Sequence, residues 1–124
     1  MALLTDKNTT KTLENRLNEF QEYATTLYYL FEEGRTNLTD LSNLFFSKDE
    51  EKTIFTYSKI MKHIKPVDIE YSLKKYSENY PNNDRDNLNK IYTKKILDLV
   101  IESKSTLIDK TYVNTYNYLL TNQK

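Results

Sequence analysis

The hydrophobic positions in the first part of the chain follow a heptad pattern. Between residues 13 and 45 they are separated alternately by four and three residues. Positions spaced in this way lie on one side of an α-helix and form a narrow stripe that packs against another helix. The hydrophobic members of this heptad stripe are Leu13, Leu17, Phe20, Ala24, Leu27, Phe31, Leu38, Leu41 and Phe45, with Gly34 at the remaining position. Because the phase is unbroken, the sequence predicts one coiled-coil-like helix of about 33 residues that begins near Thr12.

Gly34 leaves an alternative open. A glycine inside a helix costs roughly 1 kcal/mol relative to alanine, which a long packed helix can absorb. Residues 32–37 could instead end the helix, with Gly34 as the left-handed residue of the turn. Glu32 and Glu33 would then stand at the negative end of the helix dipole, which is unfavourable. Continuity through Gly34 is therefore the favoured prediction.

A second helix is predicted after Ser47. This serine is followed three residues later by Glu50, which is the spacing of a capping box. Pro66 ends that helix, because proline lacks an amide donor and restricts the residue before it. The hydrophobic positions expected to face the core from this helix are Ile54, Tyr57, Met61 and Ile64, broadened by Phe55 and Ile60.

The remaining signals predict a short third helix and a long last one. Pro66 suits the first turn of the third helix, and residues 80–84 form a loop rich in turn residues. Asn83 or Asp84 can cap the last helix. A break near residues 104–111 is an alternative there, because serine and threonine are modest helix formers.

These elements predict an all-α fold. The expected architecture is an antiparallel bundle of three to four helices with long first and last helices, in one domain over residues 1–124 with a flexible leader at 1–11. The long helices outrun the short ones, so part of the heptad stripe is expected to bind another protein or a second copy of the chain. Burial of the stripe in the chain's own core is the alternative, and its bulky phenylalanines favour that alternative.

The composition excludes several kinds of site. There is no cysteine, which removes disulfides, thiolate metal sites and a cysteine nucleophile. A single glycine cannot build a glycine-rich phosphate loop. The formal net charge is zero, so bulk charge does not steer the protein to nucleic acid or an anionic membrane. Without a signal peptide or a membrane-spanning stretch, the chain is expected to be soluble and intracellular, in the cytoplasm or nucleus.

No residues form a catalytic pattern. His63 is the single histidine and has no second metal ligand at helical spacing, so a surface position is expected for it. The neighbouring carboxylates, such as Glu19 and Glu22, are explained as charge on helix surfaces. The sequence therefore predicts a non-enzymatic interaction protein with no metal and no cofactor.

The alternative function is nucleic-acid binding by lysines and tyrosines of residues 71–95. Lysine can bind phosphate while tyrosine stacks on bases, and Tyr76 and Tyr80 lie among the lysines. Nearby acidic residues dilute the positive charge, which makes this the weaker hypothesis. Its candidate residues are Lys74, Lys75, Lys90, Lys94, Lys95 and Tyr92.

Overall fold

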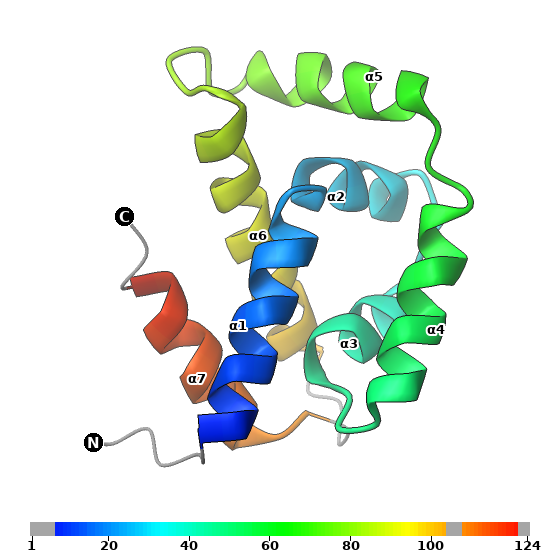
Figure 1. The fold of residues 1–124 in the computed structure, drawn as a ribbon. Coiled ribbons are helices and arrows are strands. Elements are labelled where there is room, and N and C mark those ends of the chain that lie inside the picture. The colour runs from blue at the N-terminus through cyan, green and yellow to red at the C-terminus, as the bar shows by residue number, and fades with distance from the viewer. Residues whose placement is uncertain (1–6, 104–107, 122–124) are drawn as a thin grey trace.

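The computed structural model describes residues 7–103 and 108–121. These residues form seven α-helices and no strand, so the predicted all-α class is confirmed. In Figure 1, α6 runs through the middle, α2 and α5 lie across one end, and α3 and α4 lie on the side opposite α7. The helices are α1 (Lys7–Gln21), α2 (Ala24–Glu32), α3 (Leu38–Phe46), α4 (Glu50–Met61), α5 (Pro66–Ser77), α6 (Arg85–Glu102) and α7 (Lys110–Thr121).

The predicted single helix through Gly34 is wrong, because the chain turns there between α2 and α3. Gly34 has a φ of 74°, the left-handed conformation that the alternative prediction gave it. The amide of Arg35 donates to the carbonyl of Leu30 at 2.8 Å, and the amide of Gly34 donates to the carbonyl of Phe31 at 3.1 Å. This pair of bonds is a Schellman motif, which satisfies the last carbonyls of α2 and ends the helix.

A second break, between α1 and α2, contains neither glycine nor proline. Here the side chain of Asn89, which is buried in α6, forms hydrogen bonds with backbone groups on both sides of the break. Its Oδ1 accepts hydrogen bonds from the amide of Thr25 at 3.1 Å and from the Thr25 hydroxyl at 2.6 Å. Its Nδ2 donates to the carbonyl of Glu22 at 3.0 Å. A distant helix thus supplies the hydrogen bonds that the ends of α1 and α2 lack.

Replacing Gly34 with alanine is expected to lower the free energy of unfolding by about 1–2 kcal/mol, because an L-residue is strained in the left-handed conformation. A Cβ at this position meets nothing within 4 Å, so no clash adds to that cost. Gly34→Asn is the control and should cost less, since asparagine tolerates this conformation. Urea unfolding measures the free energy of unfolding of the wild type and of both variants. Equal stability of the alanine variant and the wild type would contradict the role of Gly34 as a helix terminator.

Two of the predicted helix starts are confirmed and a third is displaced. Pro66 is the first residue of α5, and Asp84 caps α6 through its side chain. Ser47 is not the cap of α4, because Asp49 accepts the hydrogen bonds from the first amides of that helix. The Ser47 hydroxyl instead accepts from the Asp49 amide at 3.1 Å and shapes the turn before the helix.

The two ends of the chain also differ from the prediction. Helix α1 begins at Lys7, so residues 7–11 of the predicted leader are helical, and residues 1–6 lie outside the described residues. The predicted long last helix is two helices, α6 and α7, divided in the region of the alternative break. Residues 104–107 of that region lie outside the described residues. The described chain therefore consists of shorter helices than the predicted bundle of three or four.

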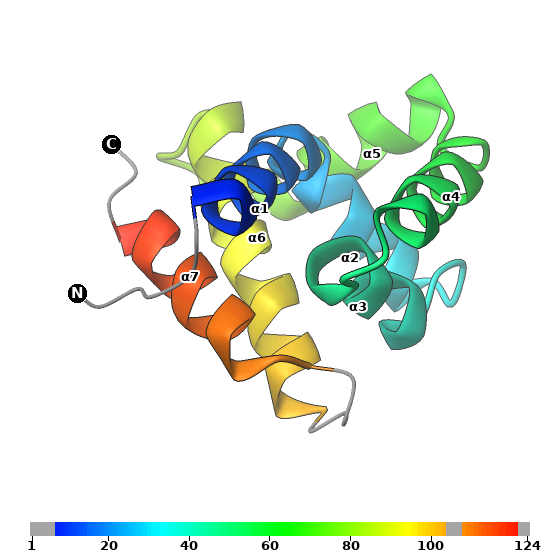
Figure 2. The same cartoon turned by 60° about the horizontal axis from the view of Figure 1, so that its bottom comes forward.

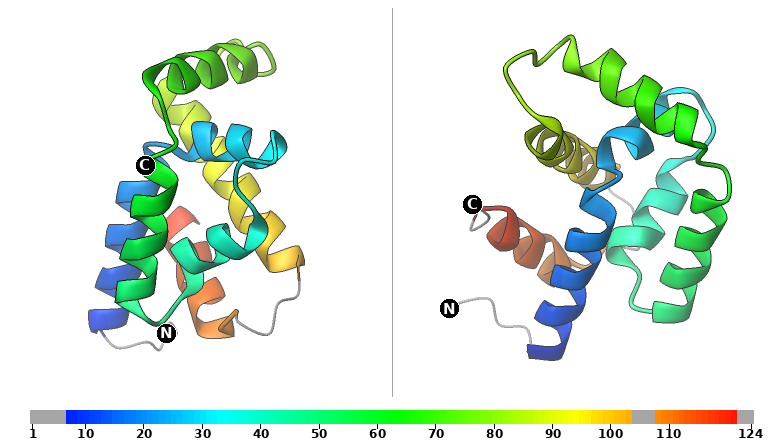
Figure 3. Two further views of the ribbon diagram at one scale, coloured as in Figure 1. Left: turned by 90° about the vertical axis from the view of Figure 1, so that its right-hand side faces the viewer. Right: turned by 45° about the horizontal axis from the view of Figure 1, so that its top comes forward.

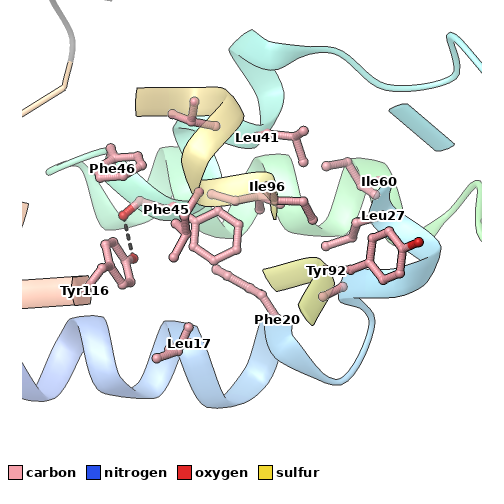
Figure 4. Packing of buried hydrophobic residues seen from close by; sticks show 14 of the residues in the cluster. Leu17, Phe20, Leu27, Leu41, Phe45, Phe46, Ile60, Tyr92, Ile96 and Tyr116 are labelled. Atoms are coloured by element: carbon pink, nitrogen blue, oxygen red, sulfur yellow. Dashed lines mark hydrogen bonds between the residues drawn. The ribbon is translucent and has the colours of Figure 1, made fainter. Parts of the chain in front are cut away.

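The core forms around α6, which packs against α1, α2, α3 and α5. Figure 2 shows α6 between α7 on one side and α2 and α3 on the other. Phe45 lies at the centre of one part of the core, with the rings of Phe20 and Tyr116 beside it (Figure 4). The Tyr116 hydroxyl donates to the Phe45 carbonyl at 2.5 Å, and burial raises the pKa of this tyrosine.

Candidate functional site

The heptad stripe, which the sequence offered as a partner surface, lies within the chain's own core. All its hydrophobic members are buried except Phe31 and Leu38, which are partly buried and pack against the core. The two breaks change the direction of the chain between α1, α2 and α3, so the stripe faces inward in each helix. Binding a partner through Leu13, Leu17, Phe20, Ala24, Leu27, Phe31, Leu38, Leu41 and Phe45 would require this core to open.

Large exposed hydrophobic side chains lie instead on α4. Ile54 is 65% exposed and Phe55 is 71% exposed, although the sequence pattern placed both toward the core. The buried side of α4 carries Thr53, Thr56 and Ile60. The Thr53 hydroxyl donates to the carbonyl of Asn43 in α3 at 3.2 Å. Helix α4 thus buries two threonines together with Ile60, whose predicted core position is confirmed, and presents Ile54 and Phe55 to solvent.

A groove of about 280 Å³ lies between α1 and α4 beside Ile54. Figure 3 (left) shows the two helices side by side. The rings of Phe20 and Tyr57 meet with their centroids 5.0 Å apart and join the two walls. Each wall is one stripe of a helix, with residues three and four apart. The lining residues are Thr12, Asn15, Arg16, Glu19, Phe20, Glu50, Thr53, Ile54 and Tyr57.

The exposed charges that line this groove are acidic. Glu19 projects from α1 and Glu50 from α4, and both are exposed. Burial raises the pKa of Tyr57, and the negative charges of Glu19 and Glu22 raise it further. Arg16 also lines the groove but is only 6% exposed. Its Nη1 has no hydrogen-bond partner among the described residues.

The predicted nucleic-acid residues do not form one surface. Lys75 and Lys95 line a hollow of about 520 Å³ among α2, α5 and α6. Lys90 and Lys94 line a different hollow, beside Leu120 of α7. Lys94 also pairs with Asp98 at 2.9 Å. Lys74 is exposed on α5 and lines neither hollow.

Tyr92 is 3% exposed and cannot offer its ring to a base. Its ring packs against those of Tyr76 and Tyr28, with centroids 4.7 and 4.9 Å away. Burial raises the pKa of Tyr92 to about 12. Burial also raises the pKa of Tyr76, whose hydroxyl donates to the carboxylate of Glu32. These tyrosines form the wall of the hollow and belong to the packing of the fold.

The two lysines of this hollow also contact rings of the chain itself. The Lys75 ammonium lies 5.7 Å from the centroid of the Tyr76 ring, and the Lys95 ammonium lies 5.9 Å from that of Tyr92. Both distances fall in the range of cation–π interactions. The structure therefore brings together only part of the predicted cluster, and its aromatic rings already have partners.

His63 is exposed after the end of α4, as the sequence predicted. Its carbonyl accepts a hydrogen bond from Arg35 at 2.9 Å. The guanidinium of Arg35 also binds both carboxylate oxygens of Asp68, at 3.1 and 3.0 Å, which holds the pKa of that carboxyl below its usual value. Within residues 7–103 and 108–121, no group of three or more histidine, aspartate or glutamate side chains is placed to hold a metal ion.

Comparisons with known proteins give no family for this chain. No protein-family model matches it, and no match was found among curated proteins or solved structures. None of the helices in the described part of the chain combines the length and the apolar character needed to cross a bilayer. The choice of a candidate site therefore depends on the geometry of the chain itself, and the groove with the exposed side of α4 is the strongest candidate.

Proposed function

We propose that this protein is a non-enzymatic interaction module that binds another protein along α4 and the groove between α4 and α1. The observation that carries the proposal is the orientation of α4, which exposes Ile54 and Phe55 and buries Thr53 and Thr56. Burying an isoleucine or phenylalanine side chain contributes about 1.5–3 kcal/mol. Hydrophobic side chains are also exposed on α5, and the pair on α4 is distinguished by the groove beside Ile54, so the two features together favour a partner here.

The groove supports the same proposal. Helices of partner proteins commonly dock in apolar grooves, with side chains at positions three and four apart as anchors. Here the partly exposed Tyr57 supplies an aromatic contact, with the buried Phe20 packed behind it, and Ile54 extends the apolar wall to the exposed side of α4. Nucleic-acid binding has weaker support, because Tyr92 is buried and the lysines are divided between two hollows.

Replacing Ile54 and Phe55 together with serine is expected to weaken partner binding strongly without unfolding the protein. Because both side chains are exposed, the free energy of unfolding should change by less than about 1 kcal/mol. Peptides selected by display on the wild-type protein should bind the double variant about tenfold or more weakly, as measured by fluorescence anisotropy.

The matched control is a double serine variant of Val67 and Tyr71, which are exposed hydrophobic residues on α5. It should bind the selected peptides as the wild type does. If the α4 variant bound every selected peptide with unchanged affinity, the proposed surface would be wrong. Light scattering tests a second copy as the partner: a wild-type dimer of the 14.8 kDa chain that becomes monomeric in the α4 variant would identify self-association through this surface.

A further inference from the structure

The groove between α1 and α4 extends for about the length of two helical turns. One wall extends along α1 from Thr12 to Phe20, and the other along α4 from Glu50 to Tyr57. At 1.5 Å per residue, each wall is about 10–12 Å long, which is about two helical turns. A partner helix would therefore place about two turns of its apolar face in the groove.

The charges around the groove indicate which kind of helix fits. Glu19 and Glu50 are exposed on opposite walls. Glu22 lies one turn after Glu19, and the negative charges of both residues raise the pKa of Tyr57. Arg16 is the cation among the described lining residues, and its burial beneath the wall leaves the accessible charge of the groove negative.

We propose, on the basis of the function proposed above, that the partner presents a basic amphipathic helix to this groove. Its apolar side chains pack against Ile54 and the partly exposed ring of Tyr57, which rests on the buried Phe20. Its lysine or arginine side chains lie beside the glutamates of the two walls. Complementary charge at the edge of an interface speeds association and selects among partners, while the apolar contacts hold the complex together.

Arg16 would favour the opposite kind of partner, an acidic helix, and the experiment has to distinguish that partner from a basic one. Its unpartnered Nη1 would donate a hydrogen bond to a carboxylate that reached it. Such a carboxylate would enter a groove whose exposed charges are those of Glu19 and Glu50. An acidic partner helix would therefore bind only if the attraction of Arg16 exceeded the repulsion of Glu19 and Glu50.

The test uses three synthetic helical peptides of about 15 residues, or four turns. Two carry leucines at the same positions, three and four apart, and are flanked either by lysine or by glutamate. The third is the lysine peptide with its leucine positions scrambled. At low salt the lysine peptide is expected to bind about ten times tighter than the glutamate peptide, as measured by fluorescence anisotropy. The preference should nearly vanish at about 1 M salt, where the Debye length is about 3 Å.

Variants of the protein test whether the preference for the lysine peptide arises from the charges of the groove. Replacing Glu19, Glu22 and Glu50 together with glutamine should make the two leucine peptides bind about equally at low salt. The control replaces Glu78 and Glu102, which do not line the groove, with glutamine and should keep the preference. Binding of either leucine peptide should be lost when Ile54 and Phe55 are replaced with serine.

The peptide measurements distinguish failure of the basic-helix proposal from failure of the interaction surface itself. Equal binding of the two leucine peptides to the wild type, or preference for the glutamate peptide, would overturn the basic-helix proposal. If that binding still depended on Ile54 and Phe55, the interaction surface itself would stand. If no peptide bound in a way that depended on these two residues, or if the scrambled peptide bound as well as the lysine peptide, the function proposed for the groove would be overturned too.

Discussion

Replacing Phe45 with alanine is expected to lower the free energy of unfolding by about 3–5 kcal/mol. Phe45 is fully buried, and its ring lies between those of Phe20 and Tyr116, at centroid distances of 5.5 and 5.7 Å. Removing the ring leaves a cavity where α1, α3 and α7 meet, and the surrounding helices relax into it only partly. A domain with a typical stability of about 5–15 kcal/mol would lose a large part of it. The midpoint of urea unfolding measures the change.

Phe55 is the matched control for this substitution. Its side chain is exposed on α4, so Phe55→Ala should change the free energy of unfolding by no more than about 0.5 kcal/mol. The comparison tests the orientation of α4 as well as the core. If Phe55→Ala were as destabilising as Phe45→Ala, Phe55 would be a core residue and the exposed hydrophobic surface of α4 would not exist.

The parts of the fold that the sequence predicted depend on residues close together in the chain. Pro66 at the first position of α5 and Asp84 at the cap of α6 act on backbone groups within one helical turn of themselves. The heptad stripe correctly identified hydrophobic residues that need burial, but it could not show that the chain reverses between them. Each of α1, α2 and α3 carries its own short piece of the stripe, so an unbroken phase is compatible with three separate helices.

The candidate site was missed because hydrophobic spacing identifies an apolar side of a helix without showing what covers it. The sequence placed Ile54 and Phe55 in the core because a helix usually buries such residues. In the structure, α4 packs on α3 through Thr53 and Thr56, whose small side chains are buried there. Which side of α4 faces α3 depends on the packing of the whole fold, which the spacing of hydrophobic residues within α4 does not describe.

The break between α1 and α2 depends on a residue far away in the chain, and replacing that residue is expected to have a large effect. Asn89→Ala should lower the free energy of unfolding by about 3 kcal/mol, because it leaves the buried amide of Thr25 and the carbonyl of Glu22 without their partners. Asn87→Ala is the control, since Asn87 is exposed on the same helix and its side chain takes no part in this contact. Urea unfolding compares the two variants with the wild type.

Hydrogen exchange at the Thr25 amide shows whether Asn89 acts in the way proposed. In the wild type this amide is bonded to the Asn89 side chain and buried, so it should exchange slowly. In Asn89→Ala it should exchange faster, while amides in the middle of α6 keep the order of protection seen in the wild type. If the variant kept both its stability and the protection of Thr25, the break would be held by the packing of α1 and α2 on α6 rather than by Asn89. If protection of Thr25 rose together with the total helicity, α1 and α2 would have joined into one helix. In that case Asn89 would be the residue that prevents the continuous helix predicted from the heptad stripe.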